Sequence, residues 1–157
     1  MKAIIVCTSV SHGNTQRIAE IMGEVLHARV VSPDQVDVAE LATYDLVGFG
    51  SGIFLGAFHA RLREFVESLP QERRGRAFVF ATSGFPDTGL TAFSRPLVQL
   101  LGRKGFDVVD TFSCRALDTF GPFKIVGGIR KDRPNGADLA AAGTFAEGLR
   151  ARVGAAS

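Results

Sequence analysis

The stretch "AIIVCTSVSHGNTQRIAEIMGEVL", residues 3–26, joins an apolar run to a helical pattern through a short polar segment. Residues 3–7 are continuously apolar rather than alternating, which is typical of a strand covered on both faces of a parallel sheet. After Asn14 and Thr15, apolar residues recur every three to four positions, which predicts a helix. The stretch therefore predicts a strand, a polar loop and a helix, the unit from which parallel α/β sheets are built.

The rest of the chain continues this alternation of strand and helix. Four more apolar runs predict strands, at residues 29–32, 45–51, 77–83 and 107–114. Apolar residues at helical spacing predict three more helices: Phe58, Leu62, Phe65, Val66 and Leu69 before Pro70; Leu97, Val98, Leu100 and Leu101 before Gly102; and Leu139, Ala142, Ala146, Leu149 and Val153. Residues 33–44 predict a short turn or a partial helix. This order predicts an α/β fold, a doubly wound three-layer sandwich around a five-stranded parallel sheet.

Length and composition limit which classes of protein this chain can belong to and which partners it can bind. A chain of 157 residues predicts one domain over residues 1–157, and 46% hydrophobic with 22% charged residues is ordinary for a globular protein. The net charge of +2, with scattered Lys and Arg, argues against a nucleic-acid partner. No apolar run approaches the roughly 20 residues that span a bilayer, so we expect no membrane insertion and a cytoplasmic location.

In an open parallel sheet, ligands bind beyond the carboxyl ends of the strands. Three predicted loops follow such ends, at residues 8–15, 51–58 and 82–90. The first is rich in hydrogen-bonding groups and opens a helix, where free N–H groups and the helix dipole favour an anion: Thr8, Ser9, Ser11, Asn14 and Thr15. It contains no Lys or Arg, so it predicts a phosphate site made of neutral donors. The alternative is that Asn14 or Ser11 simply caps the helix.

The other two loops hold apolar residues between glycines or prolines. Gly52 and Gly56 surround residues 53–55, and Phe85 stands between Gly84 and Pro86. An apolar side chain held at the ligand edge can lie against a flat ring, although each one singly can equally fold back onto the core. With the phosphate site, these loops indicate a pocket for a phosphate-bearing aromatic molecule.

Several other ligand-binding motifs are excluded because the residues that they require are missing. The Gly-Lys-Ser/Thr of a Walker loop is absent, and the glycine cluster "GFGSG" (48–52) follows the third strand, where a dinucleotide fingerprint would follow the first. The two cysteines, Cys7 and Cys114, form no metal motif, and each ends an apolar run as a small buried thiol would. Residues 115–138 are rich in Gly and Pro yet carry apolar residues, so they predict either a functional lid or an extra edge strand with turns.

The polar stretch "SVSHGNTQRIAE", residues 9–20, resembles the flavodoxin phosphate loop, and the order of strands and loops resembles that family along essentially the whole chain. The resemblance implies a sheet order of 2-1-3-4-5 and non-covalent binding of FMN. It places residues 9–15 around the phosphate, with residues 51–54 and 82–85 beside the isoalloxazine. The implied FMN-binding residues are Ser9, Val10, Ser11, His12, Gly13, Asn14, Thr15, Ser51, Gly52, Ile53, Phe54, Thr82, Ser83, Gly84 and Phe85. The implied order also separates the strands of Cys7 and Cys114 by about 14 Å, so we expect two free thiols.

The resemblance implies electron transfer, with a redox partner protein or a small electron acceptor that the sequence does not identify. In this reading the flavin does the chemistry, and we expect no catalytic side chain and no metal. One alternative is an NAD(P)H-dependent FMN oxidoreductase acting on quinones or similar acceptors. Another is a flavodoxin-fold module that has lost flavin, because Val10 and His12 stand where the family's loop often has hydroxyl residues.

Overall fold

The computed structural model describes residues 1–8, 14–54, 57–58, 60–72, 74–83, 90–115 and 136–156. Strands and helices alternate along them, as the sequence predicts. In chain order the elements are β1 (Ala3–Thr8), α1 (Asn14–Leu26), β2 (Arg29–Val31), η1 (Pro33–Gln35), α2 (Val38–Leu41), β3 (Leu46–Phe54), β4 (Ala57–Phe58), α3 (Ala60–Glu67), β5 (Arg76–Ser83), α4 (Leu90–Arg103), β6 (Asp107–Arg115) and α6 (Gly136–Ala156). In this part of the chain, no helix combines the length and apolar character that crossing a bilayer requires.

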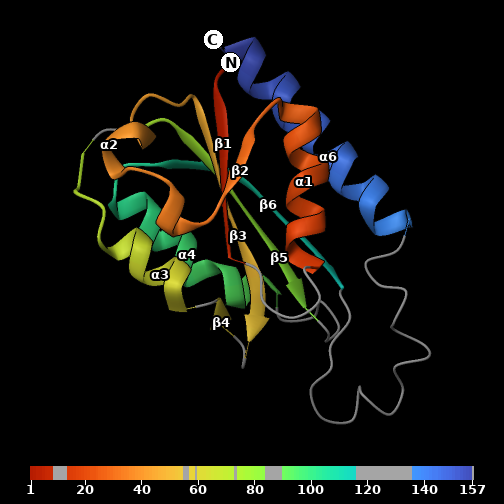
Figure 1. Cartoon of the computed structure of the whole chain (residues 1–157), viewed down its shortest axis with the longest axis horizontal. Coiled ribbons are helices and arrows are strands. Elements are labelled where there is room, and N and C mark those ends of the chain that lie inside the picture. The colour runs from red at the N-terminus through yellow and green to blue at the C-terminus, as the bar shows by residue number, and fades with distance from the viewer. Residues whose placement is uncertain are drawn as a thin grey trace.

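Five parallel strands form the sheet in the order β2-β1-β3-β5-β6. This is the order 2-1-3-4-5 that the family resemblance implies, and it is confirmed. Helices α1 and α6 cover one face of the sheet, while α2, α3 and α4 cover the other (Figure 1). The predicted doubly wound three-layer sandwich is therefore confirmed.

The central strand β1 explains why its sequence is continuously apolar. All six of its residues are buried. Alternate side chains enter different cores: Ile4 and Val6 join the one beneath α3 and α4, whereas Ile5 and Cys7 join the one beneath α1 and α6. A strand covered on both faces has no solvent side, so the alternation of apolar and polar residues disappears.

Two glycines of β3 make room for aromatic rings of the neighbouring strand. Gly48 is in register with Phe78, and Gly50 with Phe80. A Cβ atom at either glycine would overlap the ring of its partner. The two rings are fully buried and lie stacked on each other, with centroids 6.0 Å apart. This part of the "GFGSG" run therefore serves the packing of β3 against β5.

The end of β3 differs from the prediction. Residues 51–54, predicted to begin a loop, instead continue β3 through Phe54, and β3 pairs antiparallel with the short strand β4. Phe58 belongs to β4, and α3 begins only at Ala60. A strand of two residues has no periodic signature, which is why the sequence pattern missed it.

The remaining boundaries are close to the predicted ones. The stretch 33–44 folds as η1 and the single-turn helix α2, as expected for a turn or partial helix. It begins with the Ser32 N–H donating to Gln35 Oε1, and α2 begins with the Asp37 carboxylate accepting from the Ala39 N–H. Within the stretch 115–138, Arg115 ends β6 and α6 starts at Gly136. The lid and edge-strand interpretations both concern residues 116–135, which lie outside the described residues.

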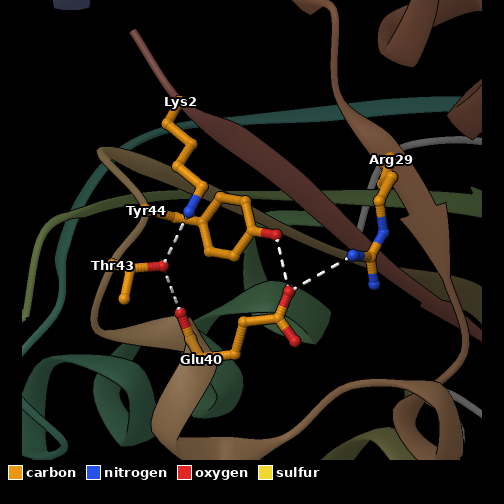
Figure 2. Close-up of polar contacts among 5 residues, drawn as sticks. All are labelled: Lys2, Arg29, Glu40, Thr43 and Tyr44. Atoms are coloured by element: carbon orange, nitrogen blue, oxygen red, sulfur yellow. Dashed lines mark hydrogen bonds and ion pairs between the residues drawn. The ribbon is translucent and has the colours of Figure 1, made fainter.

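A polar cluster joins the amino ends of β1, β2 and β3 to α2 (Figure 2). We call it the amino-end cluster; its members are Lys2, Arg29, Glu40, Thr43 and Tyr44. Oε1 of Glu40 accepts from the Tyr44 hydroxyl at 2.9 Å and from the Arg29 guanidinium at 3.2 Å. The Lys2 ammonium donates to Thr43 Oγ1 and lies 4.6 Å from the centre of the Tyr44 ring. Burial, followed by the hydrogen bond to Glu40, raises the pKa of Tyr44 above its ordinary value.

Candidate functional site

The strand ends opposite the amino-end cluster bring together residues from all three predicted ligand loops. In the sheet register, Thr8 of β1 lies beside Ser51 of β3, and Gly52 lies beside Thr82 of β5. Thr15, in the first turn of α1, contacts Thr82. We call Thr8, Thr15, Ser51, Gly52 and Thr82 the carboxyl-end cluster. The described part of the chain buries six polar or charged side chains, and four of them belong to this cluster. Buried polar groups are therefore concentrated at the ligand edge.

Two threonine hydroxyls form the centre of this cluster. Oγ1 of Thr15 and Oγ1 of Thr82 are 2.7 Å apart, and either can be the donor. Gly52 faces this pair, since a Cβ atom there would lie 3.7 Å from each hydroxyl oxygen. That is ordinary van der Waals distance, so Gly52 is not compressed as Gly48 and Gly50 are. The end of β3 thus has more room than its middle.

The hydroxyl of Thr8 is the exception among these buried groups. Thr8 is 6% exposed, and its Oγ1 has no hydrogen-bond partner among the described residues. By contrast, the neighbouring Ser51 hydroxyl donates to the Gly52 carbonyl at 2.9 Å. A buried hydroxyl without a partner costs about 1–3 kcal/mol. Thr8 therefore offers hydrogen-bonding capacity at the point where β1 ends.

The start of α1 supplies the electrostatic part of the site. The predicted helix begins at Asn14, and its first turn contains no acidic side chain. Its free N–H groups and the positive end of its dipole are therefore not neutralised by a carboxylate of that turn. Such a terminus suits a phosphate group.

The structure places part of the predicted FMN-binding set and leaves the rest outside the described residues. Those outside are Ser9, Val10, Ser11, His12, Gly13, Gly84 and Phe85. Of the others, Thr15, Gly52 and Thr82 come together from three separate segments. Asn14 opens α1, and Ser51, Gly52, Ile53 and Phe54 lie on β3 rather than in a loop; Ser83 ends β5. Thr8 belongs to the polar stretch but not to the predicted set, and only the structure shows that its hydroxyl is buried with no partner among the described residues.

The thiol of Cys7, next to Thr8, is unreactive at neutral pH. Cys7 is a free thiol and is buried, as expected. Burial, with a smaller contribution from the charge of Glu20, raises the pKa of Cys7 to about 12. The thiol therefore stays protonated at neutral pH and is no nucleophile. Strands β3 and β5 separate its strand from that of Cys114.

Residues 5–97, more than half of the chain, match the family model described as a flavodoxin domain. With the sheet order and the carboxyl-end cluster already described, this match establishes that the chain belongs to the flavodoxin family. It is also 36% identical over 149 residues to an uncharacterized protein of Methanocaldococcus jannaschii, covering 95% of this chain and 98% of that protein.

Solved structures show the same fold. A flavodoxin from the domain Archaea has a TM-score of 0.71 at 17% identity, covering 98% of this chain and 99% of its own. A WrbA-like flavodoxin from Agrobacterium tumefaciens has a TM-score of 0.69 at 17% identity, covering 98% of each chain. The apo form of an NADH:FMN oxidoreductase has a TM-score of 0.65 at 18% identity, covering 94% of this chain and 89% of its own. At these identities the likeness concerns the fold alone.

Proposed function

We propose that this chain binds FMN non-covalently at the carboxyl-end cluster and acts in electron transfer. The observation that carries the proposal is the buried hydroxyl of Thr8, which has no partner among the described residues, at the ligand edge of a flavodoxin-family sheet. The first turn of α1, which contains no acidic side chain, adds an electrostatic reason for a phosphate to bind there. Both features suit a ligand that brings its own negative charge and hydrogen-bond acceptors.

The residues divide between the two ends of the ligand. In this proposal residues 9–15 surround the phosphate, while residues 51–54 and 82–85 lie beside the isoalloxazine. When bound, the flavin supplies the redox chemistry. The protein holds it, keeps water away from it and adjusts its polarity. The electron partner is a redox protein or a small acceptor.

Neutral donors hold the phosphate in this proposal, since residues 8–15 contain no Lys or Arg. A charge added there is therefore not masked by a neighbouring cation of the loop. In Asn14→Asp, a carboxylate at the start of α1 faces a phosphate dianion, and we expect FMN affinity to fall on the order of 100-fold or more through charge repulsion. Asn14→Ser, which keeps a neutral capping group, is the matched control, and we expect it to retain most of the affinity.

Titration with FMN, followed by flavin fluorescence, measures both variants and the wild-type chain. If FMN binds but Asn14→Asp binds it as tightly as wild type, the phosphate is not held at the start of α1. If wild type binds no FMN, the chain is a flavodoxin-fold module without flavin.

The second candidate is an NAD(P)H-dependent FMN oxidoreductase, because the same fold carries an NADH:FMN oxidoreductase among the similar structures. The two candidates differ in whether the protein itself oxidises a nicotinamide. FMN-loaded protein is mixed with NAD(P)H and a quinone, and nicotinamide absorbance is followed. Consumption faster than with free FMN alone supports the enzyme. Tight FMN binding without consumption supports the electron carrier.

A further inference from the structure

The hydrogen bond between Thr15 and Thr82 links two elements that are distant in the sequence. Thr15 lies in the first turn of α1, and Thr82 is the residue before the last of β5. Figure 1 shows the start of α1 beside the arrowhead of β5. The two side chains are 3% and 4% exposed, and their hydroxyl oxygens are 2.7 Å apart. Water therefore competes little for this bond.

The direction of this bond decides what Thr15 can offer to a ligand. A hydroxyl has one proton and two lone pairs, so one partner donates and the other keeps its proton for a further acceptor. If Thr15 donates to Thr82, it presents only lone pairs to its surroundings. If Thr82 donates to Thr15, the proton of Thr15 remains available. An anion at the start of α1 favours the second arrangement, because a phosphate oxygen accepts a proton and repels a lone pair.

We propose that Thr82 is a positioning residue for the phosphate end of the flavin site. Its hydroxyl donates to Thr15, and the hydroxyl of Thr15 then donates to the phosphate. This inference rests on the proposed function, and it changes the role of Thr82, which the family resemblance places beside the isoalloxazine. The position of Thr82 on β5 and its bond to α1 together make the end of β5 sensitive to whether the phosphate is present.

Gly52 supports this arrangement from β3. Gly52 has no side chain, and a Cβ atom built there would lie 3.7 Å from each of the two hydroxyl oxygens. The described residues show no charged group bonded to either hydroxyl. Either direction of the bond is therefore open to the pair, and the ligand selects one.

The test compares FMN with riboflavin, which has the same ring system and no phosphate. Dissociation constants are measured by flavin fluorescence for wild type, Thr82→Val, Thr82→Ser, Thr15→Val and the double variant Thr15→Val/Thr82→Val. We expect Thr82→Val to weaken FMN about 10-fold and riboflavin by no more than about twofold, because the Thr15 hydroxyl loses the donor that directs its proton at the phosphate. Thr82→Ser keeps the donor and should retain FMN affinity. The double variant should bind FMN about as well as Thr15→Val alone, because Thr82 acts through Thr15.

Thr43→Val is the matched control, since it removes a threonine hydroxyl from the amino-end cluster and should leave both affinities unchanged. Equal weakening of FMN and riboflavin by Thr82→Val would overturn the inference, because Thr82 would then act on the ring. Additive effects of the two valine substitutions, or no effect of Thr82→Val, would also overturn it.

The result for wild type separates this inference from the proposed function. If wild type binds neither flavin, the proposed function fails and the role of Thr82 falls with it. If wild type prefers FMN but Thr82→Val keeps that preference, only the role of Thr82 fails. Should Thr82→Val not fold by circular dichroism, Thr82→Ala replaces it under the same criteria.

Discussion

The two ends of this sheet differ in how their polar side chains are hydrogen-bonded. At the amino-end cluster, one carboxylate and two cations meet, and the hydroxyls of Thr43 and Tyr44 are both hydrogen-bonded within the cluster. The carboxyl-end cluster contains no charged residue, and its Thr8 hydroxyl has no partner among the described residues. The first arrangement is complete in the protein alone and stabilises the fold. In the second, the described residues leave the Thr8 hydroxyl available to a ligand.

The largest expected effect is a loss of stability at alkaline pH, and it comes from Cys7, near the carboxyl end of β1. The pKa of Cys7 is raised from 9.0 to about 12, chiefly by burial, so the folded state favours the protonated thiol. The stability contributed by this group is fully present below pH 9 and is lost as the pH rises toward about 12. The loss is at most about 1.4 kcal/mol per pH unit and about 4 kcal/mol in total.

Urea unfolding across this pH range measures the effect, with Cys7→Ala as the matched variant. We expect the free energy of unfolding to fall less steeply with pH in Cys7→Ala. Tyr44, whose raised pKa also removes stability at high pH, is unchanged in both proteins and provides a common background. Identical slopes for wild type and Cys7→Ala would mean that the thiol is not shielded from water.

The next largest effect distinguishes the middle of β3 from its carboxyl end. In Gly50→Ala the new methyl group overlaps the buried Phe80 ring, and we expect a loss of about 1–3 kcal/mol from overpacking. In Gly52→Ala the methyl group has ordinary contact distances, so we expect the stability of the ligand-free protein to change by no more than about 0.5 kcal/mol. Thermal unfolding of both variants gives the comparison. Equal losses would show that the end of β3 is as tightly packed as its middle.

The smallest effect tests the comparison of the two ends directly, by replacing one threonine at each end with its isostere valine. Thr43→Val removes a hydroxyl that donates to the Glu40 carbonyl at 2.7 Å and accepts from Lys2 at 3.1 Å, and we expect a loss of about 0.5–1 kcal/mol. Thr8→Val removes a hydroxyl that has no partner among the described residues, so ligand-free stability should stay equal or rise by up to about 1 kcal/mol.

Chemical denaturation of both valine variants, with and without FMN, measures this last difference. We expect added FMN to stabilise Thr8→Val less than wild type, and Thr43→Val as much as wild type. A loss of ligand-free stability in Thr8→Val comparable to that in Thr43→Val would show that the Thr8 hydroxyl has a partner in the ligand-free protein.

Much of the candidate site was accessible from the sequence because strand ends and helix starts are local features. The apolar run of β1, the polar stretch after it and the helix from Asn14 were all predictable. Their common edge followed from the rule that the carboxyl ends of parallel strands lie together. The antiparallel pairing of β3 with β4 was not predictable, since the pairing of two residues leaves no periodic pattern.

The sequence by itself determined the fold class, the strand order through family resemblance, and the three segments that meet at the ligand edge. These depend on hydrophobic periodicity and on short motifs, which a chain carries locally. Only the tertiary structure decided that Thr15 bonds to Thr82, that Phe78 and Phe80 require Gly48 and Gly50, and that the described residues give the buried Thr8 hydroxyl no partner. These contacts depend on strand register and on the packing of α1 against the sheet, which join residues far apart in the chain and leave no mark in any one segment.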